Sequence, residues 1–91
     1  MRLEDALFNW LQIKNVAEAR PEDISAKNTV DFFGEILRED YKLNNIRMES
    51  LGDDLLQVWY DLDGITHKKS FDREMTEQLL HDINANPRYN E

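Results

Sequence analysis

The stretch from Leu55 to Phe71 constrains the fold more than any other part of the chain. Residues 55–62 alternate in polarity, which is the period of a strand. Asp63-Gly64 follows, and this dipeptide favours a two-residue type I′ turn because both positions tolerate positive φ. Residues 65–71 should therefore return as an antiparallel strand, with Leu62 opposite Ile65. The same register places Tyr60 opposite His67 and Leu56 opposite Phe71. Leu56, Val58, Tyr60 and Leu62 then share one apolar face, which helices can cover.

Two amphipathic helices precede this hairpin. Residues 2–19 carry apolar side chains at spacings of three and four, and Arg20-Pro21 ends the pattern because the residue before proline leaves helical geometry. Residues 24–40 repeat the pattern behind Asp23 or Ser25, either of which can cap a helix. The short connection predicts an antiparallel helix pair. Its expected core positions are Leu3, Leu7, Trp10, Leu11, Ala26, Val30, Phe33 and Leu37, widened by Phe32 and Ile36.

Gly34 lies inside the second predicted helix, where glycine is unfavourable. We interpret it as a site where a large ring, Trp10 or Phe8, packs close to the backbone. Use of the same space by a ligand is the alternative.

The remaining segments complete an α+β fold in the order ααβββα. Residues 46–51 precede a turn at Gly52-Asp53-Asp54 and predict a strand beside the hairpin. Asp72 can cap a third helix over about residues 73–84. Its expected core positions are Met75, Leu79, Leu80 and Ile83. We therefore expect a three-stranded antiparallel meander packed against helices, one domain over residues 1–84, and a flexible C-terminal tail over residues 85–91.

Charge and composition exclude several classes of function. Nineteen acidic residues face eleven basic ones, for a net charge of −8. Nucleic-acid binders present a basic face, and anionic membranes repel an acidic protein, so we expect neither direct nucleic-acid binding nor membrane binding. The chain has no cysteine, which excludes disulfides and thiolate chemistry. Acids follow Met1 where a secretion signal would carry bases, and no apolar run is long enough to span a membrane, so we expect a cytoplasmic protein.

No local pattern predicts catalysis, a cofactor or a metal site. Asp61-Leu62-Asp63-Gly64 resembles the start of a calcium-binding loop, but Ile65 and His67 stand where further ligands are required. His67 and His81 lack zinc-binding spacing, the serines occupy no nucleophile elbow, and no glycine-rich phosphate loop is present. We expect a protein that is not an enzyme. A deep pocket lined by His67, Tyr60 and a carboxylate of raised pKa would contradict this expectation.

Lys68 and Lys69, with Arg73 nearby, form the one basic cluster of the sequence. Lysines on the last strand commonly protect an open sheet edge from pairing. Contact with a small anion or an acidic peptide is the alternative.

Large apolar residues also fall outside the predicted core. Trp59 and Leu55 lie on the sheet face opposite it, with Gln57 between them, and Phe8 and Val16 lie beside the main stripe of the first helix. Such groups mark partner surfaces, although cover by the third helix or by a curved second layer is the alternative. The predicted partner-binding residues are Trp59, Leu55, Gln57 and Phe8. Trp59 comes first because tryptophan carries much of the binding energy at interfaces.

The opening residues 1–11, MRLEDALFNWL, and the Phe32-Phe33 helix resemble small cytosolic proteins of Bacillus-type bacteria whose function is not known. The resemblance covers about the first forty residues. It implies a bacterial housekeeping or regulatory role and assigns no functional residues.

These observations favour a small, non-catalytic protein-interaction module with a regulatory role, including self-association as a homodimer. The alternative is an acidic mimic of nucleic acid that binds a basic protein, with carboxylates in place of phosphates along one face. That function needs acids concentrated in a stripe, whereas the sequence spreads them over the helices and turns.

Overall fold

Helices, then a sheet, then short helices follow one another along the chain, which confirms the predicted α+β order. The computed structural model describes residues 2–85. Its elements are α1 (Leu3–Ala19), α2 (Ile24–Glu39), β1 (Asn44–Leu51), β2 (Leu55–Leu62), β3 (Ile65–Asp72), α3 (Arg73–Thr76) and α4 (Gln78–Ala85). The first two helices begin and end close to the predicted positions. Asp23 caps α2, because its Oδ1 accepts a hydrogen bond from the backbone N–H of Ala26.

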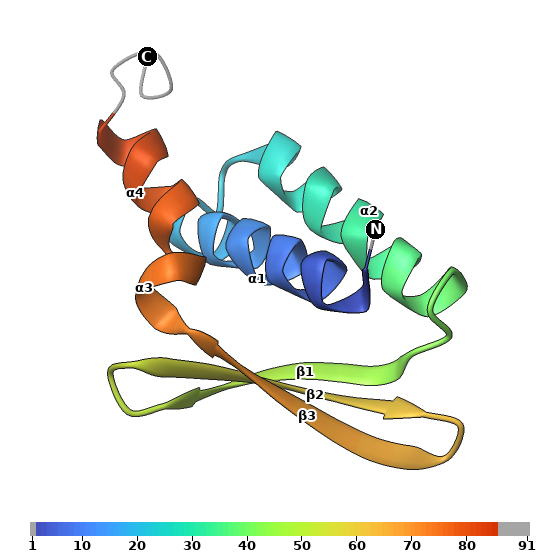
Figure 1. The fold of residues 1–91 in the computed structure, drawn as a ribbon. Coiled ribbons are helices and arrows are strands. Elements are labelled where there is room, and N and C mark those ends of the chain that lie inside the picture. The colour runs from blue at the N-terminus through green and yellow to red at the C-terminus, as the bar shows by residue number, and fades with distance from the viewer. Residues whose placement is uncertain (1, 86–91) are drawn as a thin grey trace.

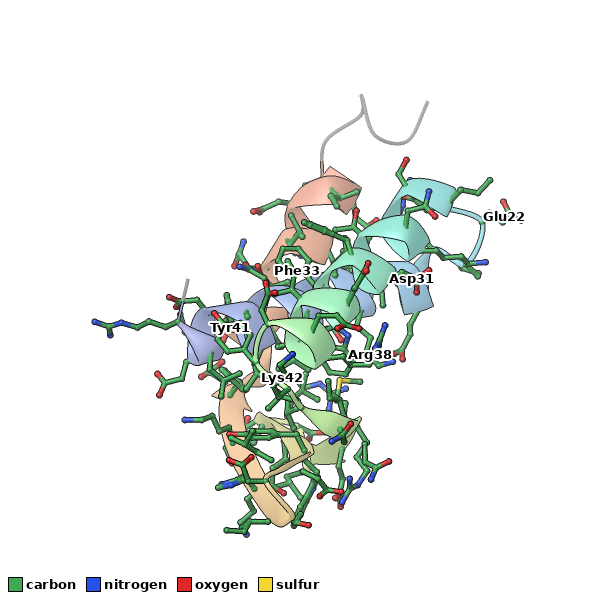
Figure 2. All side chains as sticks on the ribbon, turned by 90° about the vertical axis from the view of Figure 1, so that its right-hand side faces the viewer. Glu22, Asp31, Phe33, Arg38, Tyr41 and Lys42 are labelled. Atoms are coloured by element: carbon green, nitrogen blue, oxygen red, sulfur yellow. The ribbon has the colours of Figure 1, made fainter. Side chains whose placement is uncertain are left out.

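The helices form a layer on one side of the sheet (Figure 1). α1 and α2 are antiparallel and pack against each other. α1 lies over the β3 side, where Lys69 Nζ is 3.0 Å from Glu4 Oε1, and α2 lies towards the β1 side (Figure 2). α3 and α4 continue from β3 and pack against α1. None of the helices within residues 2–85 combines the length and apolar content needed to cross a bilayer.

The sheet has the strand order β1-β2-β3, with both neighbouring pairs antiparallel. The three predicted pairs between β2 and β3 are confirmed, and the rings of Tyr60 and His67 stack with centroids 5.4 Å apart. Asp63 and Gly64 have φ values of 53° and 78°, as a type I′ turn requires. β1 begins earlier than predicted, because a bulge at Asn45 (φ 51°) lets Asn44 join the ladder.

The core lies between α1, α2 and the inner sheet face. Most predicted helix positions contribute, and Val58 and Tyr60 meet them from β2. Phe32 is a correction, because its side chain is 52% exposed and stacks on the ring of Phe33 instead. Leu43, in the connection before β1, is fully buried although it belongs to no predicted element.

Gly34 packs against Trp10, as predicted. A Cβ added at Gly34 would lie 3.9 Å from Trp10 Nε1, which is ordinary contact, and 3.2 Å from Arg38 Nη1. Gly34 is buried between the two helices, so protein packing already occupies the space that a ligand would need.

The third predicted helix is divided at Glu77, and its inward face differs from the prediction. Met75, expected in the core, is 62% exposed, whereas Thr76 is fully buried. The Thr76 hydroxyl donates to the Arg73 carbonyl at 2.8 Å, a back-bond that bends helices. Leu79, Leu80 and Ile83 of α4 are half-buried. Ala85 ends α4 rather than beginning a tail, and the other predicted tail residues, 86–91, lie outside the described residues.

Candidate protein-interaction surface

One face of the sheet points away from the helix layer (Figure 1). We call it the outer face. Across β1, β2 and β3 it carries Arg47, Glu49, Leu51, Leu55, Gln57, Trp59, Asp61, Thr66, Lys68 and Ser70. α3 and α4 pack on the α1 side, so the described helices leave this face open.

Trp59 occupies the middle of the outer face. The strand register places Arg47 and Lys68 directly opposite it, one on each neighbouring strand. Arg47 Cζ lies 5.9 Å and Lys68 Nζ 5.5 Å from the ring centroid, which are cation–π distances. The indole Nε1–H donates to Glu49 Oε2 at 3.1 Å. The ring is thus half-buried among charged side chains that can move aside for a partner.

Asp61 closes one end of the outer face. Its carboxylate accepts hydrogen bonds from Asn45 Nδ2 at 2.8 Å and from Thr66 Oγ1 at 2.7 Å. The bond from Asn45, then the bond from Thr66 and the charge of Arg47, hold the pKa of Asp61 below its ordinary value. The group stays ionised at neutral pH, which makes it unsuited to act as a general acid there.

The opposite end of the outer face is apolar. Leu51 and Leu55 form a cross-strand pair and are 38% and 40% exposed. Between this pair and Trp59, Gln57 is only 8% exposed, and its side-chain amide donates to Ser70 Oγ at 3.3 Å. Trp59 and Leu55 therefore lie where the sequence predicted and offer contact area, whereas Gln57 offers a partner little.

Phe8 and Val16 do not join this surface. The Phe8 ring packs against Phe71 of β3 with centroids 6.1 Å apart, beneath α1 on the inner side of the sheet. Val16 is 1% exposed and belongs to the interior. The outer face and the side of α1 are thus two separate regions.

The basic cluster of the sequence is divided by strand geometry. Side chains alternate between faces, so Lys68 lies over Trp59 on the outer face while Lys69 pairs with Glu4 on the inner side. Arg73 bonds Glu77 Oε1 at 2.8 Å and the Gly52 carbonyl at 3.2 Å, which ties α3 to the first sheet turn. These cations therefore form no joint anion site.

The two histidines lie on different elements, His67 on β3 and His81 on α4. His67 stacks on Tyr60. His81 lines an open surface hollow beside α3 and α4, together with Asp53, Arg73, Glu74, Glu77 and Gln78. Within residues 2–85, no three histidine, aspartate or glutamate side chains are grouped closely enough to hold a metal ion.

Comparison of the chain with protein-family models, curated proteins and solved structures finds no match. The resemblance to proteins of Bacillus-type bacteria stays a prediction.

Sequence reasoning missed Arg47 and Glu49 as parts of this surface. Both alternate with the apolar residues of the first predicted strand, so the sequence predicts that their side chains lie on the face opposite the core. Their positions beside Trp59 depend on the β1–β2 register, which the turn at Gly52-Asp53-Asp54 does not determine as sharply as Asp63-Gly64 does.

Proposed function

We propose that this protein is a small, non-catalytic interaction module of the cytoplasm with a regulatory role. Its recognition surface is the outer face, and Trp59 is its main contact residue. One observation carries the proposal: the helices gather on one side of the sheet (Figure 1), and the strand register places a tryptophan at the centre of the face that they leave open.

The chemistry around Trp59 supports this role. Tryptophan and arginine are enriched among residues that dominate binding energy, and here Arg47 lies against the Trp59 ring. The indole is held by Glu49, so it loses little conformational freedom when a partner covers it. Leu55 and Leu51 add an apolar contact at the end of the same face. The contacts that a partner must displace are exposed and individually weak.

The test compares capture of binding partners from native cytoplasm by wild type and by Trp59→Ala. Phe32→Ala is the matched control, because Phe32 is an exposed aromatic residue on α2, outside the outer face. We expect Trp59→Ala to lose a specific partner that wild type and Phe32→Ala retain. Circular dichroism establishes that each variant is folded.

Retention of every partner by a folded Trp59→Ala protein would contradict the proposal. If Trp59→Ala unfolds, Lys68→Ala removes one cation from the ring and leaves the ring in place. Unchanged capture by that variant would then contradict the proposal.

The acidic mimic is a second candidate, favoured by one feature of α2. Asp31, Glu35 and Glu39 recur every fourth residue and are exposed, so they form a row along the helix. Arg38 is exposed on the same helix, three residues after Glu35 and directly before Glu39, so a positive charge lies beside this row. Figure 2 labels Asp31 and Arg38. Competition between this protein and a DNA duplex for a basic protein would support mimicry, and loss of competition on neutralising Glu35 would locate it.

A further inference from the structure

β1 forms one open edge of the sheet. Its regular part runs from Arg47 to Leu51, because the register shift of the bulge precedes Arg47 and the turn at Gly52 follows Leu51. An edge strand presents backbone N–H and C=O groups that can pair with another strand.

The hairpin between β2 and β3 determines which way the backbone groups point. A two-residue turn at Asp63-Gly64 makes the flanking residues, Leu62 and Ile65, a hydrogen-bonded pair. Even-numbered residues of β2 therefore direct their N–H and C=O groups to β3. Odd-numbered residues direct theirs to β1.

The same alternation continues into β1. Arg47 and Glu49 lie opposite odd-numbered residues of β2, so their backbone groups are used inside the sheet. Met48 and Ser50 direct theirs to the open edge, and Ile46 precedes them at the end of the bulge. Their side chains point to the helix side, while those of Arg47 and Glu49 lie on the outer face.

We propose that two copies of this chain associate by antiparallel pairing of their β1 strands about a two-fold axis at Met48. Met48 then pairs with Met48 of the second copy, and Ile46 pairs with Ser50. Each Arg47 faces Glu49 of the second copy in a non-hydrogen-bonded pair, the position where cross-strand side chains are closest.

The charges select this register over its neighbours. A shift of two residues in one direction places Arg47 opposite Arg47, and a shift in the other direction places Glu49 opposite Glu49. Like charges directly opposite each other destabilise a strand pair. A shift of one residue places Met48 opposite Arg47 or Glu49 of the second copy. The backbone groups of Arg47 and Glu49 already pair with β2, so they cannot bond to Met48.

The opposite edge of the sheet suits self-pairing less well. β3 carries Lys68 and Lys69 near its middle, so a pair of β3 strands centred there brings lysines together. The two edges thus differ in charge pattern, and an isologous dimer through β1 leaves β3 outside the contact.

The proposed dimer has a continuous sheet with both helix layers on one side and both Trp59 rings on the other. Stable complexes bury about 1,600 Å², and one strand edge supplies less, so association should depend on concentration. The inference does not rest on the proposed function, because β1 pairing uses an edge of the sheet and leaves the Trp59 ring uncovered.

A charge-reversal series tests the register. Sedimentation velocity of the full chain is measured from micromolar to millimolar concentration for wild type, Arg47→Glu, Glu49→Lys and the double variant. Wild type should shift from monomer to dimer. Each single reversal creates two like-charge pairs by symmetry and should raise the dimer Kd about ten-fold or more. The double variant restores opposite charges and should restore association.

Backbone controls separate the two edges. Ser50→Pro removes an N–H that points outward, so the monomer should fold and the dimer should be lost. Lys68→Pro makes the matched change on the β3 edge and should leave the dimer intact.

A wild type that stays monomeric throughout overturns the inference. So does a dimer that survives both single reversals, since it must use another surface. Trp59→Ala should still dimerise, so failure of this inference and of the proposed function are distinguishable.

Discussion

Single residues in this protein take their character from neighbours on other strands. Trp59 and Asp61 are two positions apart on the same face of β2, yet cations surround the ring and hydrogen-bond donors surround the carboxylate. Both environments include Arg47, whose Nη1 also donates to the Asn45 carbonyl at 2.7 Å. One β1 side chain therefore couples the centre of the outer face to its polar end.

Asp61 should show a measurable pH effect. Its folded-state pKa is lowered, first by the Asn45 hydrogen bond and then by the Thr66 hydroxyl. A lowered pKa contributes stability that is present above the unfolded-state pKa and lost as pH falls through the folded-state pKa. Asn45→Gly removes the amide but tolerates the positive φ, so it should raise the pKa of Asp61.

NMR titration of the Asp61 carboxyl checks this expectation. Thr66→Val, which removes the hydroxyl at similar volume, should raise the pKa less than Asn45→Gly does. An unchanged pKa in both variants would show that these hydrogen bonds are absent in solution.

Gly34 gives a second prediction for a single residue. An alanine Cβ there meets ordinary contact with Trp10 and a tighter contact with the end of the Arg38 side chain, which is exposed and can move. Alanine is about 1 kcal/mol better than glycine within a helix. Gly34→Ala should therefore raise the free energy of unfolding by up to about 1 kcal/mol. Gly34→Leu, which must displace Trp10, should lower it, and urea unfolding compares the two.

At the level of elements, local signals determined some boundaries and tertiary contacts determined others. Strand alternation and the Asp63-Gly64 turn act between adjacent residues, so β2, β3 and their register could be predicted. The phase of the last helix could not, because Thr76 is turned inward by contacts that include Asn15 of α1. Apolarity alone predicted that Met75, and not Thr76, would point into the core.

The contact between α1 and α3 can be tested directly. Asn15 Nδ2 donates to the Thr76 carbonyl at 3.2 Å in a partly buried site. Asn15→Ala should lower the free energy of unfolding by about 1 kcal/mol, the typical value of one hydrogen bond. Asn28→Ala on exposed α2 makes the same chemical change without this contact and should be neutral or stabilising. Equal effects of the two variants in urea unfolding would exclude a structural role for the Asn15 bond.

For the whole molecule, the fold was more predictable than the candidate site. Periodicity indicates which face of a strand is apolar, and this placed Trp59 and Leu55 on the outer face. Exposure is set by neighbours that periodicity does not identify. Gln57 is buried on the same face, where its side-chain amide donates to Ser70 of β3, and Phe8 packs against Phe71.

Net charge is a property of the whole molecule and should govern its response to salt. A net charge of −8 destabilises the folded state, because the negative charges repel one another. Salt screens that repulsion. The ion pairs among the described residues, such as Lys69–Glu4, lie at the surface, where their loss to screening costs little. We therefore expect the thermal unfolding midpoint to rise from low to physiological ionic strength.

Two neutralising substitutions separate repulsion from pairing. Glu35 lies one turn from both Asp31 and Glu39 on α2, so Glu35→Gln removes two like-charge contacts and should stabilise the protein at low salt by about 0.5 kcal/mol. Glu4→Gln removes the partner of Lys69 and should not stabilise it beyond the general gain from a lower net charge. Scanning calorimetry at two salt concentrations measures both variants.

If Glu35→Gln is no more stable than Glu4→Gln at low salt, the acidic row on α2 is not a source of repulsion. If salt lowers the wild-type midpoint, favourable pairing outweighs self-repulsion in this fold.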